Sequence, residues 1–439
     1  MLSRIVEIGR WNSLHMSDKV IPMIASEVFA PPGPILARSS AVTLSNVAYI
    51  CAVLATSFAL QLNKGHFHPK ALLAIVVAIG FCAAAIAGPR IAVLLPYSPH
   101  RFLRRAFLVM VAMYLAVGVA ILRYQHPIID VLLFETDSVH ALLHGQNPYG
   151  RAVTHIDLSS PGRVIYGPGV STRGRVHVGF PYPPLTLFGA LPGYIVGDVR
   201  YSCLATVVLS ALLIFSLAPD LKGFVVALLL LLAPETHFVL KMGWTEPLVL
   251  LTLAATIVSA HKWPMMLPVA LGLFLASKQY TLLAVPLAVL LFPKFSWKAY
   301  LSLIAKAGAI AAVVTVPFAF LDAQGCWRSL VTFQIAQPLR LDALSYSALL
   351  VRHSLPPIPQ WSVVLAVVLS IGFALKWASR TPSAFAGSLA LVLLVFFVLN
   401  KQAFCNYYFF CAGALCLSAA SPDSASSIFM LIKLPAAAT

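Results

Sequence analysis

The chain has 439 residues, of which 60% are hydrophobic and only 10% are charged, whereas soluble domains carry roughly 25% charged residues. This composition, with a mean hydropathy of +0.89, excludes an ordinary soluble fold. The net charge of +16 does not indicate nucleic acid as a partner, because the Lys and Arg residues stand singly between apolar segments, as in the loops of a membrane protein.

The apolar segments predict an all-α polytopic integral membrane protein with about twelve transmembrane helices. A polar cytoplasmic tail (1–40) and a C-terminal tail (421–439) flank one transmembrane domain (41–420). The expected helices, in chain order, lie near Val42–Leu62, Leu72–Ala87, Ala106–Leu122, Cys203–Leu217, Phe224–Ala233, Leu248–Ala260, Met265–Ala276, Leu282–Phe292, Tyr300–Leu321, Val363–Leu375, Phe385–Leu399 and Phe404–Leu417.

Basic residues set the expected orientation, because short cytoplasmic loops are enriched in Lys and Arg. Arg90, Arg101, Arg104 and Arg105 place the second connection in the cytoplasm. Both termini are then cytoplasmic, and the long stretches 123–201 and 322–359 form loops on the outer side.

One short apolar piece, Tyr182–Val196, breaks this count if it is treated as a span. It contains Pro183, Pro184 and Pro192, and proline removes a backbone donor and clashes with the preceding turn. We expect an interfacial or re-entrant segment on the outer side.

The stretch Ile128–Gly145 has the periodicity of an amphipathic helix on the membrane surface. One face is expected to carry Leu132, Val139, Leu142 and Leu143, and the other Asp130, Asp137, His140 and His144. The polar face has three readings: solvation alone, a metal site made by the four polar residues, or catalysis centred on Asp130 at the exit of a transmembrane helix. Solvation is the ordinary role of such a face.

Ionisable residues near membrane depth are costly and therefore indicate function. They gather on the expected outer side, whereas the cytoplasmic loops hold scattered Lys and Arg. An active site should therefore face outward. The outer group comprises Asp130, Glu135, Asp137, Glu246, Lys278, Arg340, Asp342 and Lys401.

The sequence IDVLLFETDSVHALLHGQNPYG, from Ile129 to Gly150, resembles the first outer loop of GT-C membrane glycosyltransferases, in particular glycosyltransferase family 87 and its bacterial relatives. In that family an Asp after a membrane helix precedes an amphipathic helix that ends in Leu-Leu-x-Gly-x-x-Pro-Tyr. Further pieces resemble the same relatives: FPYPPL at Phe180–Leu185, GDVRY at Gly197–Tyr201, GWTEP at Gly243–Pro247, ASKQY at Ala276–Tyr280, QPLRLDALSY at Gln337–Tyr346 and NKQAFCNYY at Asn400–Tyr408.

The resemblance implies an enzyme of the cell membrane that transfers a sugar, commonly mannose, from a polyprenyl phosphate to a lipid or glycan hydroxyl on the non-cytoplasmic side, with inversion. Asp130 matches the family's Asp as general base, and Asp137 is the reserve. Arg340 and Lys278 are the leading contacts for the phosphate and Lys401 is the third. The other substrate-binding candidates are Tyr182, Glu246, Gln279, Tyr280, Asp342, Tyr346, Gln402 and Asn406.

No cofactor or metal ion is expected, because one donor phosphate can be met by Lys and Arg and no tight Asp-x-Asp motif is present; loss of transfer in EDTA would contradict this. A multi-pass transporter or lipid flippase is the main alternative, and a lipid-binding scaffold is a third. Transporters tend to have two-fold repeats and sites near the midplane, whereas these ionisable residues gather at one surface.

Overall fold

The computed structural model describes residues 99–124, 126–154, 166, 170–172 and 175–423, all within one compact unit, Val42–Thr439. The expected cytoplasmic tail (1–40), the first two expected helices and most of the C-terminal tail lie outside these residues. The predicted domain boundaries therefore stay predictions.

The structure confirms the predicted helical membrane fold, since every apolar segment expected from Ala106 onward is helical. Five helices in the described part are long and apolar enough to cross a membrane, or six if the bent pair α8 and α9 is one span. The count of twelve is not confirmed. The long apolar helices are α4 (Pro99–Tyr124), α7 (Arg200–Leu217), α13 (Trp297–Leu321), α17 (Gln360–Trp377) and α18 (Pro382–Leu399).

The shorter helices fill the space between these spans or cover one end of them. Several are interrupted by 3-10 turns, which suit short connecting pieces. The remaining elements are α5 (Asp130–Leu143), α6 (Pro184–Val196), α8 (Leu221–Leu232), α9 (Pro234–Met242), α10 (Glu246–Lys262), η1 (Pro264–Met266), α11 (Leu267–Leu275), η2 (Gln279–Leu283), α12 (Ala284–Leu287), η3 (Ala288–Leu291), α14 (Ala323–Trp327), the π-helical η4 (Arg328–Thr332), α15 (Phe333–Ala336), α16 (Tyr346–Arg352) and α19 (Cys405–Ala420).

The expected segment at Tyr182–Val196 is the 13-residue helix α6. Pro184 stands in its first turn, where the missing N–H costs no intrahelical hydrogen bond. Gly197 ends the helix with a φ of 118°, a left-handed conformation that glycine adopts without steric cost. α6 is too short to cross a membrane by itself, in keeping with the sequence-based expectation.

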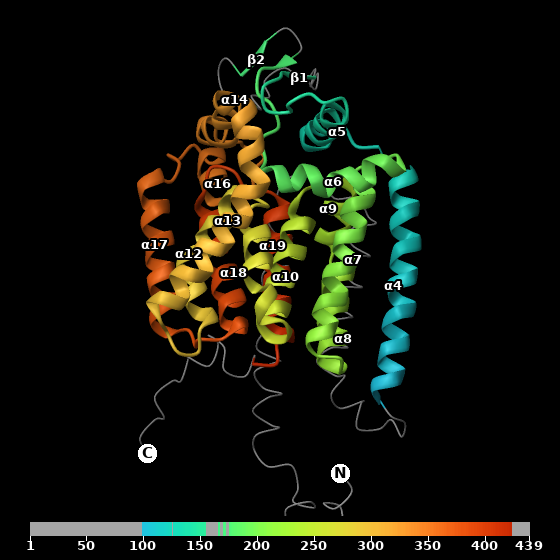
Figure 1. The fold of residues 1–439 in the computed structure, drawn as a ribbon. Coiled ribbons are helices and arrows are strands. Elements are labelled where there is room, and N and C mark those ends of the chain that lie inside the picture. The colour runs from blue at the N-terminus through green and yellow to red at the C-terminus, as the bar shows by residue number, and fades with distance from the viewer. Residues whose placement is uncertain (1–98, 125, 155–165, 167–169, 173–174, 424–439) are drawn as a thin grey trace, which may run out of the picture. The chain divides into compact units, whose positions relative to one another are not determined.

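A sheet that the sequence analysis did not anticipate lies between α5 and α6. The strands β1 (Val153–Thr154), β2 (Ser171–Thr172) and β3 (Arg175–Val176) are antiparallel in the order β1-β3-β2. Val153 pairs with Val176, and Ser171 pairs with Val176 from the other side. Figure 1 shows this sheet beside α5 and α14, at one end of the helices.

The two expected outer loops pack against each other at this end. Phe134 of α5 contacts Phe333 of α15 with ring centroids 6.4 Å apart, and Asn147 donates a hydrogen bond to the carbonyl of Phe318. Phe134, Phe318 and Phe333 belong to a separate hydrophobic cluster that also includes buried Tyr149 and Phe180. The two loops and the end of α13 thus form a folded cap with a core of its own.

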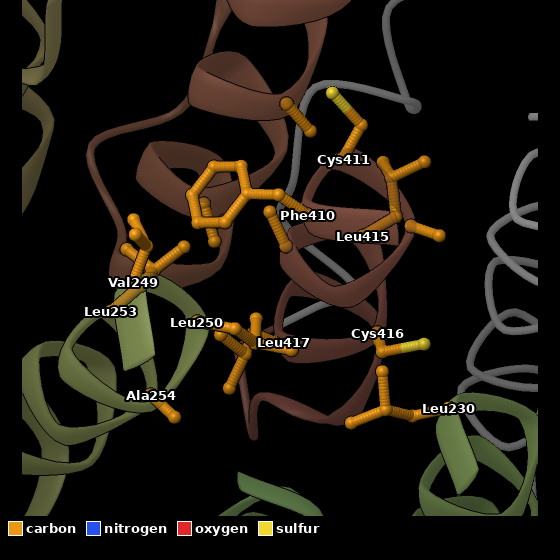
Figure 2. Packing of buried hydrophobic residues seen from close by; sticks show 14 of the residues in the cluster. Leu230, Val249, Leu250, Leu253, Ala254, Phe410, Cys411, Leu415, Cys416 and Leu417 are labelled. Atoms are coloured by element: carbon orange, nitrogen blue, oxygen red, sulfur yellow. The ribbon is translucent and has the colours of Figure 1, made fainter. Parts of the chain in front are cut away.

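The core of the membrane helices is centred on α19, whose residues are almost all buried. Figure 2 shows Leu417 of α19 beside Leu250 of α10 and the Phe410 ring toward Val249, while Cys416 faces Leu230 of α8. A Cβ placed on Gly413 would lie 2.5 Å from a methyl group of Leu250. Lipid supplies no hydrophobic driving force for the association of helices. Small residues such as Gly413 allow the helices to approach closely, and the resulting van der Waals contacts stabilise the pair.

Candidate active site

A cavity of about 1400 Å³ borders the cap, whose residues Phe134 and Phe333 contribute to its lining. Its polar residues come from distant parts of the chain: Asp130 begins α5, Lys278 precedes η2, Arg340 lies between α15 and α16, and Lys401 follows α18. The tertiary fold thus brings a carboxylate and three cations to one opening.

Most of the site residues expected from sequence line this cavity, and three do not. Asp137 lies two turns beyond Asp130 on α5, Glu246 is fully buried behind Lys278, and Tyr346 is 48% exposed at the start of α16. Their roles stay predictions. The lining includes Asp130, Tyr182, Lys278, Gln279, Tyr280, Arg340, Asp342, Lys401, Gln402 and Asn406.

Asp130 is half-buried at the first position of α5, so the helix dipole favours its charged form. Its Oδ1 accepts a hydrogen bond of 2.8 Å from the Val131 backbone N–H. Burial raises the pKa of Asp130, while the nearby Arg340 guanidinium and this hydrogen bond lower it, with a net rise. A raised pKa brings a carboxylate nearer to the range in which it can accept a proton.

Lys278 is held in a buried network beneath the cavity. Its ammonium group donates to the Thr245 hydroxyl, pairs with Glu246 Oε1 at 2.9 Å, and lies 4.1 Å from the centre of the Tyr182 ring. The GWTEP and ASKQY segments, distant in sequence, are joined by this pair. Because one side of Lys278 is occupied by a carboxylate, its charge toward the cavity is partly neutralised.

Arg340 and Lys401 are more open. Arg340 makes a two-fold contact with Asp342, through Nε to Oδ1 at 2.9 Å and Nη2 to Oδ2 at 2.6 Å, and its guanidinium lies 4.7 Å from the centre of the Phe404 ring. Lys401 Nζ donates to the carbonyl of Ile335 at 2.7 Å. Burial lowers the pKa of Lys401.

Amide groups complete the polar part of the cavity. Gln279 donates to the carbonyl of Pro181 at 2.8 Å, and Gln402 donates to the carbonyl of Pro338 at the same distance. Asn406 is buried, and its Oδ1 accepts no hydrogen bond from the residues that the structure describes. An unsatisfied buried acceptor beside a cavity favours a ligand that carries hydroxyl groups.

The cavity continues along one face of α17. The residues there recur at helical spacing from Gln360 to Ile371, which spans about 16 Å of helix. Leu282, Phe396 and Phe397 face the same space from η2 and α18. The α17 residues of this apolar track, which follow the polar Gln360, are Val363, Val364, Val367, Val368 and Ile371.

Sequence reasoning missed two residues, Tyr166 and Arg200, that contact residues of the cavity lining. Tyr166, in the long outer loop, forms a hydrogen bond with Asp130, and burial raises its pKa. Arg200, within the GDVRY segment, is 1% exposed and pairs with Asp198 at 2.6 Å. Its Nη2 also donates to the carbonyl of Leu122, and its Nη1 to that of Lys241. A lone Arg near the start of an apolar helix was the available signal.

The suggested metal site finds no support in the geometry. Across the described ranges, no group of three or more His, Cys, Asp and Glu side chains is placed to hold a metal ion. The rings of His140 and His144 instead stack with centroids 4.1 Å apart, and His144 Nδ1 lies 2.8 Å from the carbonyl oxygen of His140.

The sequence matches no protein-family model and no curated protein. Among solved structures it is similar to that of ArnT from Cupriavidus metallidurans, described as bound to undecaprenyl phosphate. The identity is 16% and the TM-score 0.48, and the match covers 72% of this chain and 59% of that one. The chain therefore spans less than two thirds of the length of ArnT.

Proposed function

We propose that this protein is a membrane glycosyltransferase that moves a sugar from a polyprenyl phosphate to an acceptor hydroxyl, with inversion. The observation that carries the proposal is a single cavity whose lining joins the Asp130 carboxylate, the cations of Lys278, Arg340 and Lys401, and an apolar track along α17. An isoprenoid phosphate has the same division into a charged head and an apolar tail. Mannose is the first sugar to test, as the resemblance to GT-C enzymes implies.

The donor would lie with its prenyl chain along the apolar track and its phosphate between Arg340 and Lys401. Val364 and Val368 are 63% and 57% exposed, so this face of α17 is open to a chain that enters sideways from the bilayer. Lys401 has no carboxylate partner among the described residues, and Arg340 has a planar fork that suits phosphate oxygens. This ordering differs from the sequence-based one, in which Lys278 preceded Lys401.

The chemistry would be a displacement at the anomeric carbon. The acceptor oxygen forms a bond to that carbon as the bond from the carbon to the phosphate oxygen breaks, and the acceptor proton passes to Asp130. The polyprenyl phosphate leaves with its electron pair, and Arg340 and Lys401 stabilise the charge that develops on it. Attack opposite to the leaving group inverts the configuration.

This chemistry fits a multi-pass protein of the cell membrane whose active site lies on the non-cytoplasmic side. The orientation comes from the Lys and Arg residues of the short loops. Lys262 is the last residue of α10, Lys294 lies in the connection between η3 and α13, and Lys298 lies in the first turn of α13. Figure 1 supports the pairing of loops that this orientation requires, because α5 and α14 lie at the same end.

The decisive experiment replaces Asp130 by Asn in protein reconstituted with a radiolabelled polyprenyl-phosphate sugar. We expect the transfer rate to fall by about 10²–10⁴-fold, the usual contribution of a general base, while binding of polyprenyl phosphate persists. Asp137→Asn is the matched control and should keep its activity. Full activity in Asp130→Asn, or loss of activity only in Asp137→Asn, contradicts the assignment.

A further inference from the structure

Basic and aromatic side chains gather at the end of α13 and α17 that lies away from the cap. α13 begins there at Trp297 and runs to the cap, where Phe318 is part of the cap core. α17 runs from Gln360 in the cavity lining to Trp377, about 25 Å along the helix. Figure 1 shows the cap at the opposite end of both helices. We call these side chains the basic cluster: Lys294, Phe295, Trp297, Lys298, Lys376, Trp377 and Arg380.

Contacts between cations and aromatic rings order the basic cluster. The Arg380 guanidinium lies 5.5 Å from the centre of the Phe295 ring, although the two residues are distant in sequence. Phe295 packs edge to face against Trp297, with ring centroids 4.9 Å apart. On α17, Lys376 Nζ lies 4.4 Å from the centre of the Trp377 ring. The rings thus hold two of the cations in place through cation–π attraction, so an anion that binds them has less side-chain motion to restrict.

No carboxylate neutralises the basic cluster within the part of the chain that the structure describes. Its four cations make no ion pair there, and the sequence holds no Asp or Glu between Pro293 and Leu321. Asp423 is the acidic residue near Arg380, since its Oδ2 accepts from the Ser383 backbone N–H, but its Oδ1 lies 3.2 Å from His261 Nε2. The basic cluster therefore keeps a positive charge that suits an anion.

The two helices that carry the basic cluster are the least covered by protein. In an 18-residue apolar window, only 17% of α13 and 17% of α17 is buried, whereas α7 and α18 each bury 61%. Trp297 is 67% exposed and Trp377 is 41% exposed. Tryptophan at the end of a membrane helix is typical of the level of the lipid headgroups. Lipid, with its headgroup beside the cations, is therefore the molecule that meets this surface.

We propose that the basic cluster is a binding site for an anionic phospholipid, with Arg380 as the central contact for its phosphate. An exposed guanidinium that rests on a ring keeps its N–H groups free for two phosphate oxygens, and Lys298 and Lys376 add positive charge. The acyl chains lie along the exposed apolar faces of α13 and α17. The loop charges predict that this end is cytoplasmic, where anionic lipids give the leaflet a negative potential. The site is separate from the cavity and does not depend on the proposed function.

Native mass spectrometry of the full chain, released from detergent, tests this inference. The protein is titrated with phosphatidylglycerol and, separately, with phosphatidylcholine that has the same acyl chains. Both lipids carry a phosphate, but only phosphatidylglycerol has a net negative charge. We expect phosphatidylglycerol to bind about tenfold more tightly, because several Lys and Arg side chains attract that charge. Equal affinity for the two lipids would overturn the proposal.

A matched pair of variants distinguishes a site from diffuse surface charge. Arg380→Gln should weaken phosphatidylglycerol binding about fivefold, the contribution of one basic residue near an anionic lipid, and leave phosphatidylcholine binding unchanged. Arg104→Gln is the control, because Arg104 is an exposed arginine near the start of α4, and Figure 1 shows α4 and α17 on opposite sides of the molecule. Equal losses in the two variants would show attraction to any basic residue at this end and would overturn the site.

Phe295→Leu separates the geometry of the site from its charge. This variant keeps every cation and removes the ring beneath Arg380, so phosphatidylglycerol binding should weaken about threefold, as for the loss of an exposed cation–π contact. Gel filtration and the melting temperature check that each variant is folded. Unchanged affinity in Phe295→Leu would overturn the stacked arrangement. Displacement of the lipid by inorganic phosphate would show a site for free phosphate and would overturn the assignment to a phospholipid.

Discussion

Two pairs of a cation and a carboxylate stand at the cavity, and they differ in exposure. The Lys278–Glu246 pair is buried, with side-chain exposures of 6% and 0%, whereas the Arg340–Asp342 pair has exposures of 20% and 33%. A buried pair cannot release its cation without leaving a desolvated charge behind. In an exposed pair the cation can exchange its carboxylate partner for a phosphate, because water solvates the carboxylate that is released. The difference predicts a structural role for the buried Lys278–Glu246 pair and a binding role for the open Arg340–Asp342 pair.

The largest expected effect is on stability. Glu246→Gln leaves the Lys278 ammonium buried without its carboxylate, and we expect it to lower the free energy of unfolding by about 3–5 kcal/mol. Asp342→Asn, the matched change in the open pair, should cost about 1 kcal/mol or less. Chemical denaturation in detergent measures both. Equal losses in the two variants would remove the distinction between the pairs.

The second effect concerns donor binding. Arg340→Lys keeps the charge and loses the planar fork, so we expect KM for the polyprenyl-phosphate donor to rise about tenfold or more, as for the loss of a hydrogen bond between charged groups. Arg352→Lys is the control, because Arg352 is exposed and donates to the carbonyls of Leu341 and Ala343 outside the cavity lining. A donor KM unchanged by Arg340→Lys would exclude the two-fold phosphate contact.

The third effect is a dependence of rate on pH. A general base must be deprotonated, so the rate should fall about tenfold per pH unit below the pKa of Asp130, which burial raises. Because Arg340 lowers this pKa and Asp342 raises it slightly, Arg340→Gln should move the acidic limb of the profile to higher pH. The initial rate measured across pH checks this, and a limb that moves to lower pH contradicts it.

The smallest effect concerns Glu135, a 3% exposed carboxyl on α5 whose Oε2 has no hydrogen-bond partner among the described residues. Burial raises its pKa from 4.5 to about 8; Lys278 opposes the rise, and Glu246 and Asp198 add to it. The folded state keeps a proton that the unfolded state loses, so this group makes stability fall as pH rises from 4.5 to about 8.

Glu135→Gln removes that titration. We expect the melting temperature of the variant, relative to the unmodified protein, to increase steadily across this pH window and to level off above it. A gain of 1 kcal/mol corresponds to roughly 2–4 °C in a domain of moderate size. Melting curves that run parallel across the window would show that Glu135 does not titrate there.

The sequence predicted the membrane helices because a long apolar segment in lipid must satisfy its own backbone hydrogen bonds, and a helix does so within the segment. It also located α5, although Leu143, expected on the apolar face, is 52% exposed. The periodicity of a sequence predicts which residues share a face of a helix. It does not predict which other element packs against that face. The short strands of the cap and the bend of 48° between α8 and α9 were missed for the same reason, since both depend on neighbours distant in sequence.

By itself, the sequence determined the apolar spans, which follow from local composition. It also predicted an outward side for the charged residues, from the Lys and Arg distribution, and Asp130 as the base, from the resemblance of its segment to the GT-C enzymes. Only the tertiary structure decided that Asp130, Arg340 and Lys401 share one cavity, that Lys278 pairs with the buried Glu246, and that this cavity continues along α17. The environment of a charged side chain depends on residues hundreds of positions away. Local sequence carries no information about such contacts.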